Sequence, residues 1–171
     1  YKVKGEGFFI AAFRKTEEPD ALRLKIKNSQ VASKQEAAIA ANWINSSESL
    51  TFIKQGQNIA AIPMQWNETI QYLMQELKVR YAGVELGTIA KNDLLPEHAL
   101  ALSTILKDDV VKVELTLAQS LDYLRKNEII IDSSHKGWAL ALYNNFPLGW
   151  MKLLGNRINN YYPKEWRILM R

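Results

Sequence analysis

Near the end of the sequence, basic and aromatic side chains are mixed with asparagines in a pattern that suits contact with RNA. The segment PLGWMKLLGNRINNYYPKEWR, residues 147–167, holds four basic, four aromatic and three asparagine residues. Lysine and arginine neutralise phosphates, and aromatic rings stack on unpaired bases. An asparagine amide both donates and accepts hydrogen bonds, so it can meet a base edge or a sugar hydroxyl. These residue types therefore predict an RNA-binding surface.

Each candidate residue of this surface has a role that follows from its type. The basic side chains would hold phosphates, the asparagines would meet sugars or base edges, and a tyrosine would stack on a base. The alternative is that the aromatic side chains are core and the charges are only solvated, which we favour for Trp138 and Trp150 because both lie in expected strands. The candidates are Lys136, Lys152, Asn156, Arg157, Asn160, Tyr161, Tyr162, Lys164 and Arg167.

The charge of the chain is unevenly distributed. The formal net charge of the 171 residues is +4. Residues 135–171 contain six basic side chains and one acidic side chain, whereas residues 84–134 contain five basic and nine acidic ones. This asymmetry indicates an anionic partner for one face of the protein.

The composition excludes several kinds of active site. The chain has no cysteine, which excludes disulfides, thiolate metal sites and a cysteine nucleophile. Its two histidines, His98 and His135, are too few for a histidine-rich metal site, and no glycine-rich phosphate loop is present. The run IDSSHKG around His135 does not make a catalytic triad, because sequence neighbours do not have triad geometry. We interpret His135 as a loop residue and His98 as a capping or packing residue.

Two further features bear on location. No apolar run approaches the length that crosses a bilayer, and no basic-then-apolar leader is present. We therefore expect a cytoplasmic protein without membrane contact.

The chain begins at Tyr1 rather than at a methionine, from which we expect a fragment of a longer protein.

Short helices and short strands are expected to alternate irregularly along the chain. This order predicts an α+β fold with a small mixed sheet or pseudo-barrel, not a doubly wound parallel sheet. Capping signals predict helices from Ser33 to about Ile44, from Asn67, from Pro96 to about residue 106, and from Thr116. Strands are expected at 2–15, where both faces are apolar, at 79–86, 111–115 and 128–131, and in hairpins at 50–63 and 136–154, which turn at Gln55-Gly56 and Asn144-Asn145.

Several spaced segments resemble one enzyme family, the RsmF-like, Nol/Nop/Sun-family methyltransferases that modify cytosine C5 in ribosomal RNA. The segment GEGFFIAAFRK (5–15) resembles the last strand of their catalytic domain, and most of 80–167 resembles their PUA-like RNA-binding domain. Asn159 and Tyr161 depart from the lysine and histidine of the family's closing mark. The matching residues are Gly83, Val84, Gly87, Pro96, His98, Ala99, Leu100, Ala101, Leu148, Gly149, Trp150 and Lys152, with Asn160, Tyr162, Pro163, Lys164 and Arg167 in the closing mark.

The resemblance implies that the chain has three parts and that catalysis and RNA positioning belong to different domains of the enzyme. Residues 1–32 would be the last strand of a methyltransferase domain plus a linker, 33–79 a small α+β connector, and 80–171 a PUA-like domain. In that family a cysteine thiolate attacks cytosine and S-adenosylmethionine supplies the methyl group. This chain has neither a cysteine nor a cofactor loop. We therefore expect it to bind no cofactor and not to catalyse alone, but to position small-subunit ribosomal RNA for its methyltransferase domain.

Two alternatives stay open. The chain could be a protein-interaction or scaffolding domain, whose terminal aromatic side chains pack on the catalytic domain or on a ribosomal protein. A free-standing enzyme would require a pocket that brings His98 or His135 beside an acid and a nucleophile. Naked RNA and an assembled subunit are both open as the substrate.

Overall fold

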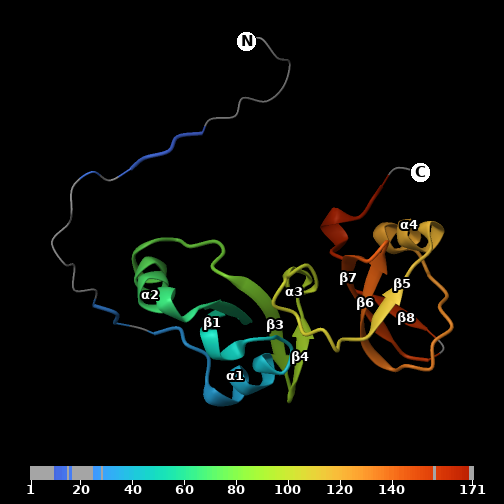
Figure 1. The fold of residues 1–171 in the computed structure, drawn as a ribbon, viewed down its shortest axis with the longest axis horizontal. Helices are drawn as coiled ribbons and strands as arrows, with labels where there is room; N and C mark the ends of the chain where they lie inside the picture. Colours follow the sequence, from blue (N-terminus) through green and yellow to red (C-terminus); the bar gives the residue numbers. More distant parts are fainter. Residues whose placement is uncertain (1–9, 15, 17–24, 28, 156, 170–171) are drawn as a thin grey trace, which may run out of the picture.

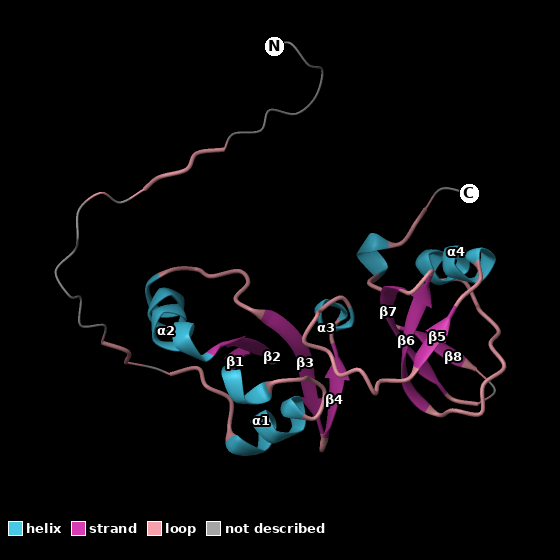
Figure 2. Ribbon diagram, in the orientation of Figure 1, coloured by secondary structure: helices cyan, strands magenta, loops and turns pink. Residues whose placement is uncertain are grey.

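Two four-stranded sheets follow one another along the chain and lie side by side (Figures 1 and 2). The computed structural model describes residues 10–14, 16, 25–27, 29–155 and 157–169. The strand orders are β1-β2-β3-β4 and β5-β6-β7-β8, and within the described residues neither sheet closes into a barrel. The predicted α+β class with a small mixed sheet is confirmed, because the second sheet has both parallel and antiparallel pairs.

The first sheet is antiparallel throughout and contains the hairpin predicted at 50–63. Gly56 makes its turn with a φ of +65°, a conformation that suits glycine. The sheet takes strands from both sides of the division that we predicted at 79/80, and the chain passes to the second sheet only after Pro96. The strands are β1 (Leu50–Gln55), β2 (Asn58–Pro63), β3 (Val84–Ala90) and β4 (Asp93–Pro96).

Helices cover both faces of the first sheet, because its strands alternate apolar side chains. α1 (Lys34–Ala41) packs on the face that contains Phe52 and Ile59, and α2 (Asn67–Glu76) packs on the face that contains Ile53 and Ile62. The capping box of α1 is confirmed by hydrogen bonds in both directions between Ser33 and Glu36, at 2.9 and 3.3 Å. The predicted Asn67 cap of α2 is wrong: Asn67 is the first helical residue, directly after the 3₁₀ turn η2 (Met64–Trp66).

The helix predicted from Pro96 to about residue 106 is wrong in extent. α3 (His98–Ala101) is a single turn, and Pro96 ends strand β4. The following residues pair with another segment instead of continuing the helix: the Lys107 N–H donates to the carbonyl of Trp43 at 3.1 Å, and Leu106 forms a bridge with Ile44. A second short 3₁₀ turn, η1 (Ser47–Ser49), leads into β1.

The second sheet combines one parallel and two antiparallel pairs. Its central hairpin turns at Asn144 and Asn145, as predicted, with φ values of 50° and 64°. The helix predicted from Thr116 is confirmed with its capping box to Gln119. The strand predicted at 128–131 is wrong, because this segment joins no ladder. The elements are β5 (Lys112–Glu114), α4 (Leu117–Arg125), β6 (Gly137–Tyr143), β7 (Phe146–Leu153), β8 (Ile158–Asn160) and the 3₁₀ turn η3 (Lys164–Trp166).

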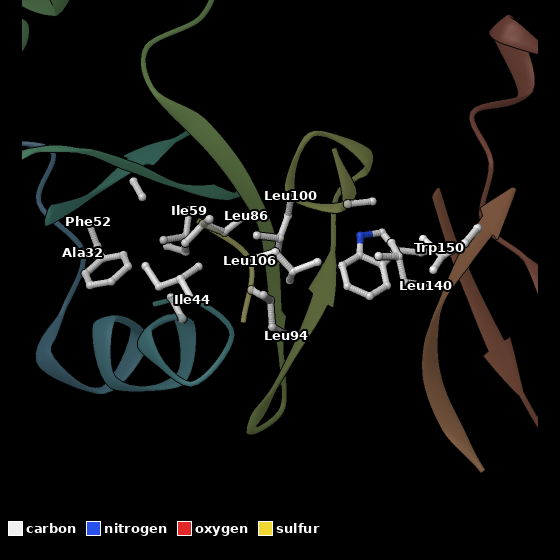
Figure 3. Close-up of a cluster of buried hydrophobic side chains, with 14 residues drawn as sticks. Ala32, Ile44, Phe52, Ile59, Leu86, Leu94, Leu100, Leu106, Leu140 and Trp150 are labelled. Atoms are coloured by element: carbon white, nitrogen blue, oxygen red, sulfur yellow. The ribbon is translucent and has the colours of Figure 1, made fainter. Parts of the chain in front are cut away.

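The two faces of the second sheet are buried against different neighbours. Helix α4 covers one face through Tyr123, which packs with Ala139 and Met151. The other face directs Leu140 and Trp150 into the cluster of the first sheet (Figure 3). One apolar cluster therefore joins the two sheets, and it contains Ala32, Ala40, Ile44, Phe52, Ile59, Ala61, Leu86, Leu94, Leu100, Ala101, Leu106, Leu140, Leu142 and Trp150.

The predicted strand at 2–15 falls mostly outside the described residues. Its described part, 10–14, forms no strand, and Ile10 and Phe13 are 77% and 95% exposed. None of the helices in the described part of the chain has the length and apolar character that crossing a membrane requires.

Candidate nucleic-acid interface

The register of the second sheet places aromatic and basic candidates next to one another. Trp138 on β6 pairs with Lys152 on β7, which pairs in turn with Asn159 on β8. Side chains directly opposite in a ladder point to the same face. The Tyr161 N–H donates to the carbonyl of Trp150 at 3.0 Å. Trp150 and Tyr161 each lie two residues along the strand from Lys152 and Asn159, so their side chains lie on the same face. This face therefore carries two tryptophans, a lysine and a tyrosine.

Edge-to-face contacts connect four rings across this face. The ring centres of Trp43 and Trp150 are 5.6 Å apart, those of Trp150 and Trp138 are 6.4 Å apart, and those of Trp138 and Tyr161 are 4.5 Å apart. The Nζ atom of Lys152 lies 5.1 Å from the centre of the Trp138 ring, within the range of a cation–π contact. We call these five residues the aromatic row. Within the row Trp150 is buried, at 1% exposed, whereas Tyr161 at one end is 42% exposed.

The two adjacent candidate tyrosines have different environments. The ring of Tyr162 is half-buried and lies 5.6 Å from Tyr123 and 5.4 Å from His98. Tyr161 instead lies against Trp138 and is exposed to solvent. Only Tyr161 of the pair presents a ring that a base can reach without repacking the protein.

The side chain of Asn160 holds the backbone of its neighbours. Its Nδ2 donates to the carbonyl of Tyr123 at 2.7 Å, and its Oδ1 accepts from the Tyr162 N–H at 2.8 Å. Both ends of the amide are therefore occupied within the protein. Asn156, the other candidate asparagine, lies outside the described residues.

Lys126 is a residue that the sequence reasoning missed. It ends α4 in the left-handed conformation, with a φ of 61°. Its Nζ donates to the carbonyls of Asn160 and Tyr162, at 3.1 and 2.6 Å. Burial lowers the pKa of Lys126, and two nearby cations, Lys164 and Arg167, lower it further, whereas a nearby carboxylate raises it. Lys126 therefore fastens the segment after β8 to helix α4. The only sequence signal for this role of Lys126 was its position at the end of an amphipathic helix.

The remaining basic candidates are exposed and fall into two places. Lys136 and Arg157 both lie near Gly155: a Cβ atom built there would be 3.4 Å from Cε of Lys136, and Arg157 lines a hollow with Gly155. Lys164 and Arg167 line another hollow, in the segment that follows β8. The structure therefore brings Lys152 and Tyr161 together with Trp138, and it gathers Lys164 and Arg167 elsewhere.

His98 is a packing residue, as predicted. Its buried ring lies 5.4 Å from the ring of Tyr162 and 5.1 Å from that of Trp166, and burial lowers its pKa, which favours the neutral form. Gly149 lies against it: a Cβ atom there would be 2.9 Å from Nδ1 of His98 and 2.6 Å from Oη of Tyr123. The Tyr123 hydroxyl donates to the carbonyl of Trp150 at 2.9 Å, so it is held in place. This contact explains physically why a glycine precedes Trp150.

His135 lies in the loop before β6, as predicted. Its side chain is half-buried, and its backbone N–H donates to the Ser133 hydroxyl at 3.2 Å. Across the part of the chain that the structure describes, no group of three or more histidine, aspartate or glutamate side chains is arranged to hold a metal ion.

Comparisons with known proteins agree with this architecture. Residues 110–168 match the family described as the methyltransferase RsmF PUA domain. The proteins named ribosomal RNA small subunit methyltransferase F from Shigella boydii serotype 4 (strain Sb227) and Aliivibrio fischeri (strain MJ11) are 23% and 25% identical to this chain. Each alignment covers 94% of this chain and 35% of the relative, so the chain spans about a third of the length of these relatives. The matches confirm the resemblance predicted from the sequence.

Proposed function

Taking residues 110–168 as a PUA domain of the RsmF type, we propose that this chain is the RNA-binding region of a ribosomal RNA cytosine-C5 methyltransferase. It grips small-subunit ribosomal RNA and presents one cytosine to a methyltransferase domain that lies outside this sequence. The relatives named as ribosomal RNA small subunit methyltransferases support the class of RNA.

The aromatic row is the observation that carries this proposal. It places the cation of Lys152 and the exposed ring of Tyr161 next to the indole of Trp138. A phosphate is attracted by the lysine while the adjoining base stacks on the tyrosine, which is how single-stranded nucleic acid is commonly bound. Lys136 and Arg157 are exposed and supply further positive charge. Asn160 and Tyr162 are left out of the proposed contact surface, because both are engaged within the protein.

The methyl transfer itself would be carried out by another part of the enzyme. Within the described residues, no strand leads through a glycine-rich turn into a helix, which is one common way to hold the phosphates of a nucleotide-containing cofactor. The chain also has no cysteine to attack cytosine. We assign both the S-adenosylmethionine site and the nucleophile to the methyltransferase domain.

Binding of small-subunit ribosomal RNA at several salt concentrations tests the proposal. An RNA-binding surface releases counterions, so the logarithm of the affinity should fall linearly as the logarithm of the salt concentration rises. The purified chain should bind at low salt and lose affinity steeply as salt increases. Absence of binding at low salt would contradict the proposal.

A contact with protein is the second candidate function, and exposed apolar side chains after β8 favour it. Trp166 and Leu169 are 60% and 77% exposed, in a segment that also carries Lys164 and Arg167. These side chains could pack on the methyltransferase domain while the aromatic row meets RNA. If the chain binds its methyltransferase domain with an affinity that does not change with salt, this protein contact is the main interface.

A further inference from the structure

Helix α2 exposes one apolar face to solvent. Trp66 and Leu77, which flank the helix, and Leu73 within it are 53%, 60% and 38% exposed. They are separated by seven and four positions, the spacing that places side chains on one face of a helix. Ile70 and Met74 pack on the sheet from the adjoining face. We call Trp66, Leu73 and Leu77 the α2 stripe.

The charges of α2 suit a protein partner for this stripe better than RNA. The helix Asn67–Glu76 carries two charged side chains, Glu68 and Glu76, and both are acidic. Carboxylates repel the phosphates of a nucleic acid, whereas RNA-binding surfaces supply lysine and arginine. An exposed apolar face on a helix is instead typical of a surface that packs into an apolar groove of another protein domain.

The segment that precedes α1 is fixed on this same helix. The Lys27 N–H donates to Oε1 of Gln75 at 2.8 Å, and the Gln30 N–H donates to Oε1 of Gln71 at 2.9 Å. Gln75 lies two positions from either leucine of the α2 stripe, so this segment follows another face and leaves the stripe open. The chain before Lys27 therefore starts beside α2, on the side of the first sheet away from the second sheet (Figure 1).

A short linker joins this point to the segment that resembles a catalytic-domain strand. Eleven residues, 16–26, separate residues 5–15 from Lys27. Fully extended, they reach at most about 40 Å. A domain on so short a linker has an effective concentration in the millimolar range, at which even a small apolar contact is occupied. The α2 stripe is therefore within reach of whatever domain precedes this linker.

We propose that the α2 stripe is the docking surface for the methyltransferase domain that precedes this chain in the complete protein. The inference rests on the proposed function, which places that domain outside this sequence. It assigns the contact between domains to α2 and not to the exposed side chains after β8. The aromatic row on the second sheet stays free for RNA, so docking at α2 fixes the catalytic site relative to the bound RNA.

Hydroxyl-radical footprinting read by mass spectrometry tests the docking surface without any substitution. The oxidation rate of a side chain follows its exposure, so Trp66 should react about fivefold more slowly in the complete protein than in this chain, because an interface core excludes water. Trp166, which is 60% exposed, should react at nearly the same rate in both. Equal rates at Trp66 would overturn the inference, and so would protection of Trp166 without Trp66.

A concentration series of this chain alone tests a second copy as the occupant. The oxidation rate of Trp66 should not depend on protein concentration when the methyltransferase domain is absent. A rate that falls as the concentration rises would show that copies of this chain cover the stripe, and would overturn the assignment to the methyltransferase domain.

Two matched double variants of the complete protein give a further test. Trp66→Ser with Leu77→Ser removes two exposed side chains of the stripe, and Trp166→Ser with Leu169→Ser removes the same residue types after β8. Small-angle X-ray scattering measures the radius of gyration. The stripe variant should have a larger radius than the unmodified protein, because a released domain moves away on its linker, whereas the control should not change. No increase in the stripe variant, or an increase in the control alone, would overturn the inference.

Two measurements on this chain by itself keep these outcomes distinct. Urea unfolding with the same substitutions should give a midpoint close to that of the unmodified chain, because the replaced side chains are exposed. The footprint decides the question if a substitution unfolds the chain. Failure of the unmodified chain to bind small-subunit ribosomal RNA, with Trp66 protected in the complete protein, would contradict the proposed function and leave the docking surface in place.

Discussion

At the scale of single residues, the adjacent Tyr161 and Tyr162 have different expected roles: the first in RNA binding and the second in the stability of the fold. Tyr161 is exposed beside Trp138, whereas Tyr162 packs on Tyr123 and His98. Tyr161→Ala should weaken binding to single-stranded RNA by about 1–3 kcal/mol, the range found for loss of one base-stacking ring. Its unfolding midpoint in urea should stay close to that of the unmodified chain.

Tyr162→Ala is the matched variant, with the opposite expectation. Removal of a ring that packs between two others should lower the free energy of unfolding by about 2 kcal/mol. Urea denaturation and RNA titration of both variants measure the two effects. If Tyr162→Ala loses RNA affinity while its stability is unchanged, the assignment of the two rings is wrong.

Gly149 has no room for a side chain. A Cβ atom there would lie 2.6 Å from Oη of Tyr123, and its φ of 146° is a conformation that other residues rarely adopt. Gly149→Ala should therefore lower the free energy of unfolding by about 3 kcal/mol. Gly56→Ala is the control: its φ is 65° but no atom lies within 4 Å, so it should cost only about 1 kcal/mol. Equal losses in the two variants would mean that the clash at Gly149 is relieved by repacking.

At the scale of the elements, the start of α1 is tied to β1 by an ion pair. Lys54 Nζ lies 2.7 Å from Oε1 of Glu36. The pKa of Glu36 is lowered from 4.5 to about 2, chiefly by the hydrogen bond from Lys54 and then by that from Ser33. The carboxylate therefore contributes stability that is complete above about pH 4.5 and is lost as the pH falls toward 2.

The lowered pKa of Glu36 predicts how a neutral replacement of this residue changes stability with pH. Glu36→Gln can keep the capping geometry but removes the charge, so its thermal midpoint should lie below that of the unmodified chain at pH 6. The gap should narrow between pH 4.5 and 2 as the native carboxylate is protonated. Thermal melts across this range measure the gap, and a gap independent of pH would show that the ion pair adds no stability.

Elements with their own local signals were predictable from the sequence. The capping boxes at Ser33 and Thr116 and the Asn144-Asn145 turn all place their stabilising groups within a few residues. The α3 segment was not predictable in this way. It stops after one turn because residues 106 and 107 pair with Ile44 and Trp43, about 60 positions earlier in the chain.

A β-bulge explains why the aromatic row was only partly foreseen. The pairing changes register between Ala141 and Leu142, so the extra residue Leu148 has no partner in the ladder. Counting outward from the turn without this bulge would place Trp138 opposite Met151. With the bulge, Trp138 pairs with Lys152 and shares its face. A shift of one residue reverses which side chains share a face, and no local sequence signal fixed this shift.

At the scale of the whole molecule, the two sheets share one apolar cluster. Leu140 and Trp150 come from the second sheet and pack with residues such as Leu86 and Leu100 of the first part of the chain (Figure 3). The Trp150 indole N–H also donates to the carbonyl of Glu97 at 2.9 Å. Because of these contacts, the two sheets share a core although the chain forms one sheet after the other.

This shared cluster predicts that both sheets unfold together. Urea denaturation followed by far-ultraviolet circular dichroism and by tryptophan fluorescence should give coincident transitions. Trp150→Phe, which keeps a large apolar ring but loses the hydrogen bond to Glu97, should shift both transitions equally. Two separate transitions in the unmodified chain would contradict a common core.

The salt dependence of RNA binding in a lysine variant tests the central claim most directly. Lys152 belongs to the aromatic row, Lys136 is exposed near Gly155, and both are proposed to neutralise phosphates. Each lost phosphate contact on a single strand should reduce the slope of log affinity against log salt by about 0.7. Lys136→Ala combined with Lys152→Ala should therefore flatten the slope by about 1.4, while the unfolding midpoint stays nearly constant. An unchanged slope would place the RNA away from this face and contradict the account.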